Sequence, residues 1–418
     1  MSRPDVRELP VASAGLRRGE VVVPTRVGDA VHGVLSCPAA PLVAASLRAR
    51  GRPVRLADLT GRPSADADAR LYLVTCPQED GGTAAVAAAA APGDALSAAA
   101  ARAAVEEWAA VCANRSLLMA STPWCSGALH AAGAARQAAA DHQGTGRRVH
   151  VLTPAAMPPE TLSALAELGA VVTDSLDEVE PGDVVVVPAH GVTAERRAEV
   201  ARRNVTVVDA TCPVVAAAQA AAGRAADGRS HLVLVGQRDH AATDPIISQA
   251  PGRVTIADTP AKTAAVGAGN GGPVSYLLQP GLAPEAGAPI LSALRSRYPA
   301  ARPAVPAEIC YAPSDRAGTI YSVALGSDVM LVVGDPRAGD TRHVCGLARD
   351  SGTKVQLIGD VADIKAAMLA SVQTIGLAES TSARAGLAAE TLTALSGLGR
   401  LTVARRRLAT EKAAGVLG

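Results

Sequence analysis

The sequence predicts a multi-domain α/β protein with mostly parallel sheets. Short apolar runs recur along the chain, for example at 183–188 and 328–334, and segments of helical pattern such as 159–168 lie between them. The runs are apolar on both faces, as is typical of parallel strands that helices cover on either side. With 418 residues, the chain is long enough for two to four such domains.

The N-terminal residues 1–113 form a block of their own, which we expect to be a small α/β extension. The pattern predicts strands at 20–24, 33–36, 53–58 and 69–76 and a helix at 42–50. After the turn at 77–82 the chain is dense in alanine as far as Ala113. Because alanine has the highest helix propensity, this stretch is predicted to be helical, with a break at Pro92.

The rest of the chain continues the alternation of strands and helices. Strands are predicted at 117–121, 149–153, 170–173, 183–188, 205–208, 231–236, 254–257, 274–279, 328–334, 354–359 and 372–378. Their spacing predicts three α/β domains of similar size, at 114–203, 204–308 and 309–400, and a polar C-terminal tail at 401–418.

Composition excludes several classes of protein. The net charge is +1, so bulk electrostatics favours neither a nucleic acid nor a membrane surface as partner. No apolar run reaches the ~18 residues of a spanning helix, and the N-terminus lacks a signal pattern. We expect a cytoplasmic protein with no membrane partner. The seven cysteines are an odd number and widely scattered, which argues against a disulfide framework.

Three cysteines stand where a strand gives way to a helix. Cys212 follows the strand 205–208, and Pro213 opens a helix directly after it. The helix dipole lowers the pKa of such a thiol and favours thiolate. Cys125 and Cys310 have comparable positions, and about one α/β domain separates each cysteine from the next. Three thiolates meeting at the carboxyl ends of their sheets would suit an iron–sulfur cluster with one open iron. Equally, each could be an ordinary buried cysteine.

Four motifs stand out in this part of the chain: Asp209-Ala-Thr-Cys-Pro-Val-Val215, Pro188-Ala-His-Gly-Val192, Ile309-Cys-Tyr-Ala312 and Trp124-Cys-Ser-Gly127. They resemble the motifs of the IspH/LytB family of 4-hydroxy-3-methylbut-2-enyl diphosphate reductases. The resemblance runs in order and spacing from about residue 117 to the end, and residues 1–113 lie outside it.

This resemblance implies three α/β domains around a central [4Fe–4S] cluster held by Cys125, Cys212 and Cys310. It implies reductive removal of the allylic hydroxyl of an allylic diphosphate, giving isopentenyl and dimethylallyl diphosphate for isoprenoid biosynthesis. The two electrons would come from a ferredoxin- or flavodoxin-type donor. The open iron would act as a Lewis acid on the substrate oxygen.

The resemblance also assigns the substrate side of the site. His190, His240 and Ser382 fall on diphosphate-binding positions, and Gln279 and Asp244 are the candidate catalytic residues, Asp244 as a substitute proton donor. Without the resemblance, each histidine would be read as an ordinary hydrogen-bonded loop residue. Five positions depart from the family pattern: Met157, Ala242, Pro280, Ala338 and Asp340. An aspartate at 340 would repel a diphosphate unless Arg337 or Arg342 neutralised it.

These departures keep two alternatives open. One is a divergent paralogue that uses the same cluster on a different oxygenated substrate, and the other is a non-catalytic cluster-binding protein. In the N-terminal block, Cys37-Pro38 and Cys76-Pro77 repeat the pattern of Cys212-Pro213. They are a second redox or metal site, the mark of a distant duplication of the same α/β unit, or ordinary turns, and turns are favoured. Cys112 and Cys345 are expected to be core thiols.

Overall fold

The chain divides into two compact units. Unit 1 comprises Met1–Ser121 and Gly318–Arg407, and unit 2 comprises Thr122–Ala317 and Leu408–Gly418. The computed structural model describes residues 5–12, 15–60, 68–120, 124–152, 157, 159–227, 230–266, 273–304 and 309–410. As predicted, the fold is α/β with mostly parallel sheets in the part that carries the cysteine motifs.

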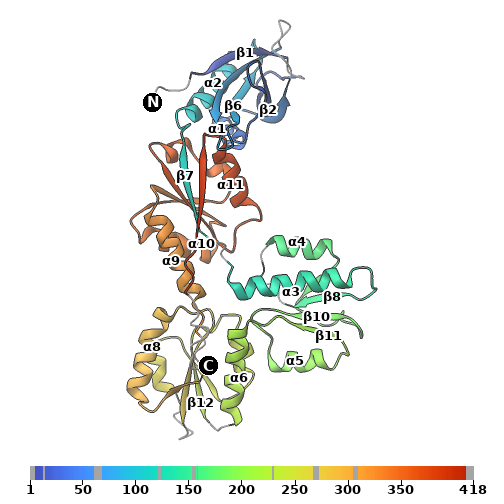
Figure 1. Cartoon of the computed structure of the whole chain (residues 1–418), viewed down its shortest axis with the longest axis vertical. Helices are drawn as coiled ribbons and strands as arrows, with labels where there is room; N and C mark the ends of the chain where they lie inside the picture. Colours follow the sequence, from blue (N-terminus) through green and yellow to red (C-terminus); the bar gives the residue numbers. More distant parts are fainter. Residues whose placement is uncertain are drawn as a thin grey trace. The chain divides into compact units, whose positions relative to one another are not determined.

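The N-terminal extension in unit 1 is a six-stranded mixed sheet with two helices. Its strands run in the order β1-β5-β6-β3-β2-β4. The elements are β1 (Arg7–Val11), β2 (Val21–Asp29), β3 (Gly33–Ser36), α1 (Ala40–Ala49), β4 (Val54–Leu59), β5 (Ala69–Pro77), β6 (Thr83–Ala90) and α2 (Ala95–Ala109). α1 and α2 contact each other and both pack against β6 (Figure 1).

The alanine-dense segment 83–90 is a strand, so its predicted helix was wrong. β6 pairs with β5 from Pro77↔Thr83 to Arg70↔Ala90, and residues 84–90 are almost completely buried. The advantage of alanine in a helix is below about 1 kcal/mol per residue, so strand pairing and burial outweigh it here. Alanine side chains also let α1 and α2 approach the sheet closely. The second half of the alanine-rich region is helical, as α2.

The second sheet of unit 1 has five parallel strands in the order β17-β16-β18-β7-β19. Its elements are β7 (Arg115–Ala120), β16 (Val329–Val333), α10 (Gly339–Arg349), β17 (Lys354–Ile358), β18 (Thr374–Glu379), α11 (Leu387–Ser396) and β19 (Leu401–Arg406), with short 3-10 helices η2 (Val361–Asp363) and η3 (Ala366–Leu369). α9 (Ala312–Leu325) crosses the boundary between the units.

Two predicted domain boundaries differ from this topology. β7 was expected to begin the domain 114–203, but it pairs with β18 and β19 at the other end of the chain. Residues 401–406 were expected in a polar tail, but they form the edge strand β19. The apolar pattern identifies a strand without naming its partners, because pairing depends on side-chain packing between distant segments.

The extension and the five-stranded sheet share one hydrophobic core. Buried side chains of β5, α1, β18 and α11 belong to the same cluster, including Leu73, Leu42, Leu377 and Leu395. At Gly397, just after α11, an added Cβ would lie 2.5 Å from the backbone nitrogen of Ala39. The extension is therefore packed onto the sheet of β7 and is no separate appendage.

Unit 2 contains two four-stranded parallel sheets, β11-β10-β8-β9 and β13-β12-β14-β15. The first has α3 (Ser126–His142), β8 (Val149–Leu152), α4 (Pro159–Glu167), β9 (Val171–Thr173), β10 (Val184–Val187), α5 (Ala194–Ala201) and β11 (Thr206–Asp209). The second has α6 (Pro213–Asp227), β12 (His231–Val235), α7 (Thr243–Ile247), β13 (Val254–Ala257), η1 (Pro260–Ala265), β14 (Val274–Leu278), α8 (Pro284–Arg297) and β15 (Arg302–Pro303).

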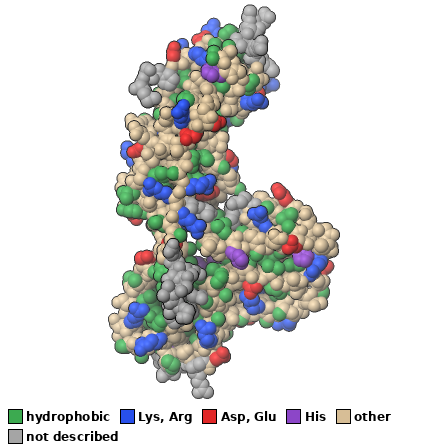
Figure 2. Space-filling view, in the orientation of Figure 1, with side chains coloured by type: hydrophobic (Ala, Val, Ile, Leu, Met, Phe, Trp, Pro, Cys, Tyr) green, Lys and Arg blue, Asp and Glu red, His purple; other side chains and the backbone are tan. Residues whose placement is uncertain are grey.

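The chain passes from the first to the second sheet of unit 2 at Cys212. β11 pairs with β10 and so belongs to the first sheet, although the boundary predicted at 204 placed it in the second domain. α6 packs its buried face against β12, in the second sheet. Within the described residues every helix is too short or too polar to cross a bilayer. Acidic and basic side chains are interspersed over the visible face in Figure 2, in keeping with the near-zero net charge.

The close approach at Gly397 gives a test of the shared core. Gly397→Ala should destabilise unit 1 by about 1–3 kcal/mol, because the new methyl group would displace the backbone of Ala39. Urea unfolding followed by circular dichroism measures this. Gly346→Ala, inside α10 where nothing lies within 4 Å of the added Cβ, is the matched control and should be neutral or stabilising by up to about 1 kcal/mol. Equal effects of the two substitutions would contradict the close packing.

Candidate functional site

Cys212 lies at the junction of β11 and α6. Its backbone N–H donates to the carbonyl oxygen of Ala189 at 2.9 Å, which ties the junction to the loop after β10. Asp209 orders the turn before it by accepting hydrogen bonds from the N–H of Thr211 at 3.1 Å and from Arg197 at 2.7 Å. The helix that begins at Pro213 places its positive end beside the half-buried thiol, as predicted.

Cys125 is the N-cap residue of α3. Its Sγ accepts a hydrogen bond from the N–H of Ala128 at 3.4 Å. Two residues on, a Cβ added to Gly127 would lie 2.8 Å from Sγ of Cys212 and 3.8 Å from Sγ of Cys125. The two sulfur atoms are therefore no farther apart than the sum of these distances. The absence of a side chain at Gly127 permits this approach.

Cys310 completes the group of thiols. Burial raises the pKa of Cys310, hydrogen bonds from the backbone of Ala312 and Gly281 oppose the shift, and the charges of Cys125 and Cys212 add to it. These mutual effects mean that the three sulfur atoms lie within electrostatic range of one another. The structure thus brings together the three cysteines that the sequence singled out, all within unit 2.

A pair of histidines lies beside the thiols. The rings of His190, in the loop after β10, and His240, in the loop after β12, meet edge to face with centroids 5.2 Å apart and an interplanar angle of 75°. Gly281, whose backbone N–H donates to Cys310, lies against the ring of His240, since a Cβ added to Gly281 would lie 2.5 Å from Nε2 of His240. Gly281 has φ +92°, so the close contact and the backbone conformation both require glycine. Sequence analysis missed Gly127 and Gly281, although the Ser-Gly and Pro-Gly pairs beside the motifs could have pointed to them.

Both histidines are neutral at pH 7. Burial lowers the pKa of His190 to about 4, helped by the charge of His240, and burial also lowers the pKa of His240. Nδ1 of His240 accepts a hydrogen bond from the N–H of Ala242 at 3.2 Å, so its ring proton is on Nε2. The pair therefore presents uncharged N–H donors, which a bound anion would convert towards the charged form.

Gln279 holds the loop that carries His240. Its side chain is 1% exposed; Nε2 donates to the carbonyl of Gln237 at 2.9 Å and to the hydroxyl of Thr243, and Oε1 accepts from the N–H of Gln237 at 2.9 Å. Both ends of the amide are occupied by this loop. The contacts support a positioning role for Gln279 in place of the direct catalytic contact that we predicted.

Asp244, the predicted proton donor, lies in the first turn of α7. Its side chain is 77% exposed and its carboxylate is 4.0 Å from the guanidinium of Arg238. Met157 and Ala242, two of the positions where this chain departs from the family pattern, carry apolar side chains, and both are buried. The carboxylate predicted to be the substitute proton donor is therefore open to solvent in the free protein.

Ser382 belongs to a cluster of hydroxyl groups in unit 1, at the carboxyl ends of β16 and β18. Its Oγ is 2.9 Å from Oγ1 of Thr341 and 3.0 Å from Oγ of Ser380, and those two atoms are 2.9 Å apart. A Cβ at Gly334 would collide with the hydroxyls of Ser380 and Thr341. The hydroxyl of Ser382 thus has two hydroxyl neighbours, and the side chain of Ser382 also interacts with the Asp340 carboxylate.

Asp340, in the first turn of α10, is satisfied by the loop after β18 and not by an arginine. Its carboxylate accepts from the N–H of Ser382 at 3.0 Å and from the hydroxyl of Thr381. Burial raises the pKa of Asp340, but these hydrogen bonds outweigh it and the net shift is downward. Arg337 pairs with Asp335, and Arg342 donates to the carbonyl of Arg337. The predicted neutralisation by Arg337 or Arg342 was wrong, because backbone and hydroxyl donors are nearer.

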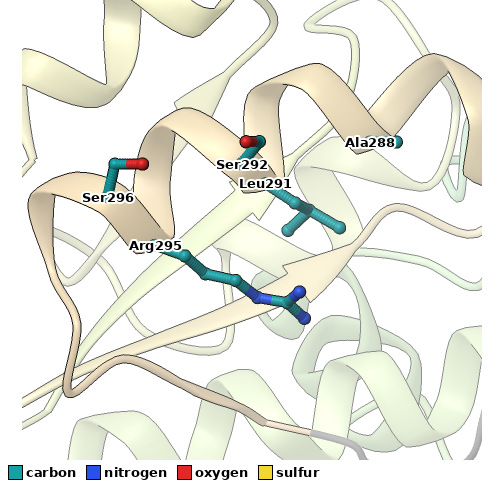
Figure 3. A pocket seen from close by; sticks show the side chains of 5 residues that line it. All are labelled: Ala288, Leu291, Ser292, Arg295 and Ser296. Carbon is teal, nitrogen blue, oxygen red and sulfur yellow. The ribbon is translucent and has the colours of Figure 1, made fainter.

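A hollow of about 440 Å³ on α8 is lined by Ala288, Leu291, Ser292, Arg295 and Ser296 (Figure 3). The guanidinium of Arg295 donates to the hydroxyl of Tyr276 at 2.5 Å and lies 5.2 Å from the centre of its ring. Its charge is therefore engaged with the adjacent strand β14, and we assign no ligand to this surface.

Residues 117–396 match the family described as LytB protein. The chain belongs to this family. Cys125, Cys212 and Cys310 all fall inside the matched region, whereas the six-stranded extension, with Cys37, Cys76 and Cys112, lies outside it. The family resemblance inferred from the motifs is confirmed.

Several relatives carry the name of one enzyme. "4-hydroxy-3-methylbut-2-enyl diphosphate reductase 2" of Mycobacterium bovis is 37% identical over 254 residues, which cover 60% of this LytB chain and 77% of the relative. The reductase of Zymomonas mobilis is 29% identical over 253 residues, with coverages of 60% and 74%. The solved structure of the E-1-hydroxy-2-methyl-but-2-enyl-4-diphosphate reductase from Plasmodium falciparum has a TM-score of 0.58 at 19% identity, covering 72% of this chain and 94% of that one. This structural likeness speaks for the fold alone.

The half-buried histidines His190 and His240 make stability depend on pH. Between pH 6.5 and 4 the unfolded chain binds a proton that the folded chain excludes from His190, so stability falls as the pH falls. Through His190, the free energy of unfolding should fall by about 2 kcal/mol between pH 7 and pH 5. Urea unfolding of His190→Asn at the two pH values should show a smaller loss than wild type. His130→Asn, an exposed histidine on α3, is the matched control and should keep the wild-type loss. The same loss in all three proteins would contradict the burial effect.

Proposed function

We propose that this protein is an iron–sulfur-dependent 4-hydroxy-3-methylbut-2-enyl diphosphate reductase of isoprenoid biosynthesis. Its family and the names of its relatives support this activity. The observation that carries the proposal is the convergence of the three motif cysteines beside two neutral histidines in unit 2. In the proposed reaction an allylic C–O bond breaks, two electrons and two protons are consumed, and the oxygen leaves as water.

The three thiols fit the ligand set of a [4Fe–4S] cluster with one open iron. A single metal ion would need thiolate ligands about 3–4 Å apart. Within the described ranges no three His, Cys, Asp or Glu side chains are arranged in that way. Cys125 and Cys212 stand at the N-termini of α3 and α6, and burial raises the pKa of Cys310. When bound, the cluster would supply electrons from a ferredoxin- or flavodoxin-type donor and a Lewis-acidic iron.

His190 and His240 are the proposed ligands of the diphosphate. Each offers a ring N–H from a half-buried position, where a hydrogen bond to a charged group contributes about 1.5–3 kcal/mol. Gln279 keeps the loop of His240 in place, and Gly281 lets that ring approach the backbone beside Cys310. For Ser382 we propose a phosphate-binding role that draws on the hydroxyl cluster with Thr341 and Ser380.

A second candidate is reduction of a different oxygenated substrate by the same cluster. The buried, apolar side chains of Met157 and Ala242 favour it, because they offer no polar atom to a phosphate or a proton. The carboxylate of Asp340, which accepts its hydrogen bonds from within the chain, also favours this second candidate. Both candidates require the same three thiols, and they differ in the group that the ligand presents to the histidine side.

Turnover decides between these candidates. The protein is purified without oxygen, its iron and sulfide are measured, and it is incubated with 4-hydroxy-3-methylbut-2-enyl diphosphate and a reduced viologen dye. We expect about four irons per chain and the formation of isopentenyl and dimethylallyl diphosphate. A cluster-loaded protein that leaves the diphosphate unchanged would exclude the first candidate, and a protein without iron would exclude both.

Cys212→Ser should remove the cluster. The substitution replaces a soft thiolate by a hydroxyl, so we expect iron content and the visible absorption of the cluster to collapse and turnover to fall by more than about 100-fold. Cys345→Ala is the matched control, since Cys345 is a buried thiol of α10 in unit 1. It should retain both iron and turnover. Normal iron content in the Cys212 variant would remove this residue from the ligand set.

Asp244 is retained as the proposed proton donor, in spite of its exposure, because catalytic contacts often form only in the substrate complex. Asp244→Asn should then lower kcat by ~10²–10⁴-fold without loss of the cluster. Asp239→Asn, an exposed carboxylate on the other side of His240, should leave kcat unchanged. If the two variants match wild type, the proton comes from another group.

A further inference from the structure

We propose that Cys76 and Cys112, in the N-terminal extension, form a reversible disulfide by thiol–disulfide exchange with low-molecular-weight disulfides. Both residues lie outside the region that matches the LytB family, and the proposed reductase activity makes no use of them. The pair would be a redox site of the extension itself.

The two thiols are in direct contact. Cys76 is near the end of β5 and Cys112 follows α2, and their Sγ atoms are 2.9 Å apart with Cys76 as hydrogen-bond donor. A disulfide bond is about 2.05 Å long, so bond formation needs an approach of roughly 1 Å. Sequence analysis treated Cys112 as a plain core thiol, because the two residues are far apart in sequence and only the packing of α2 on β5 and β6 brings them together.

Cys37 is excluded as the partner of Cys76, although the sequence repeats the Cys-Pro pattern at both. Ser36 and Cys76 both pair with Ala84, from opposite sides of β6. Two strand spacings, about 9–10 Å, therefore separate the backbones of Ser36 and Cys76, and Cys37 directly follows Ser36. This separation exceeds the Cα–Cα distance of about 7 Å that a disulfide can bridge. Burial also raises the pKa of Cys37 to about 12, so this thiol is unreactive.

The surroundings distinguish the roles of the two thiols. Cys112 is partly exposed, and the hydrogen bond from Cys76 lowers the pKa of Cys112; burial opposes this shift and the charge of Arg115 supports it. Arg115 is held there by hydrogen bonds to the carbonyls of Val111 and Leu369. Cys76 is 1% exposed, and its hydrogen bond and burial raise the pKa of Cys76. Cys112 is therefore the attacking thiol and Cys76 the resolving thiol.

The exchange balances with one external disulfide. The Cys112 thiolate attacks one sulfur of the disulfide, forms a mixed disulfide and releases a thiolate. Cys76 then loses its proton and attacks Sγ of Cys112, which forms the intramolecular bond and releases the second thiolate. Two protein thiols are oxidised and one small-molecule disulfide is reduced to two thiols. The new bond joins β5 to the segment that leads into β7, the first strand of the family region.

The test uses the full-length, cluster-loaded protein without oxygen. It is incubated with glutathione disulfide, blocked with iodoacetamide, digested and analysed by mass spectrometry. We expect a peptide pair linked through Cys76 and Cys112, which dithiothreitol abolishes. Cys37→Ser is the matched control and should retain the link. Recovery of Cys76 and Cys112 as alkylated thiols, or a link between Cys37 and Cys76, would overturn the proposal.

Two further variants test the order of attack. In Cys76→Ser the exchange should stop at a glutathione adduct on Cys112. In Cys112→Ser, Cys76 should be modified at least about tenfold more slowly, because it is buried. Equal modification of the two cysteines would overturn the assignment of Cys112 as the attacking thiol.

Discussion

The site depends on one close approach, that of the N-terminus of α3 to the thiol of Cys212. Gly127 lies between Cys125 and Cys212, and any side chain there would overlap Sγ of Cys212. The approach places the positive ends of α3 and α6 beside the thiols of Cys125 and Cys212. Cys310 joins the same group from the segment before α9. Three thiols from three separate elements thus meet in unit 2.

Burial governs the other half of the site. Desolvation keeps His190 and His240 uncharged in the free protein, and the contact between their rings adds to the effect on His190. A neutral histidine pair donates hydrogen bonds from its ring N–H groups. A bound anion would favour the protonated, charged form of the rings. Gln279 and Gly281 support this arrangement from behind, one by bonding the loop and the other by leaving room for the ring.

The extension is integrated into unit 1 through a common core. β7 leaves α2 and enters directly into the sheet of β16 and β18, and α1 packs near α11. The thiol pair of Cys76 and Cys112 stands on that connection, on the extension side of β7. A chemical event in the extension would therefore act on chain segments that are already packed against the family's own sheet.

Local sequence patterns were enough to predict the α/β class and the parallel strands of the family region, and to single out the three cysteines and two histidines that lie together in unit 2. Apolar runs and strand–Cys–helix motifs are such local patterns. The strand pairing of β7, β11 and β19, the strand at the alanine run 83–90, and the contact of Cys76 with Cys112 were decided by the tertiary structure alone. Each depends on packing between segments distant in sequence, which outweighs local propensity and leaves no trace in spacing. The same holds for Gln279 and Asp340, whose hydrogen-bond partners, and hence whose roles, only the folded chain defines.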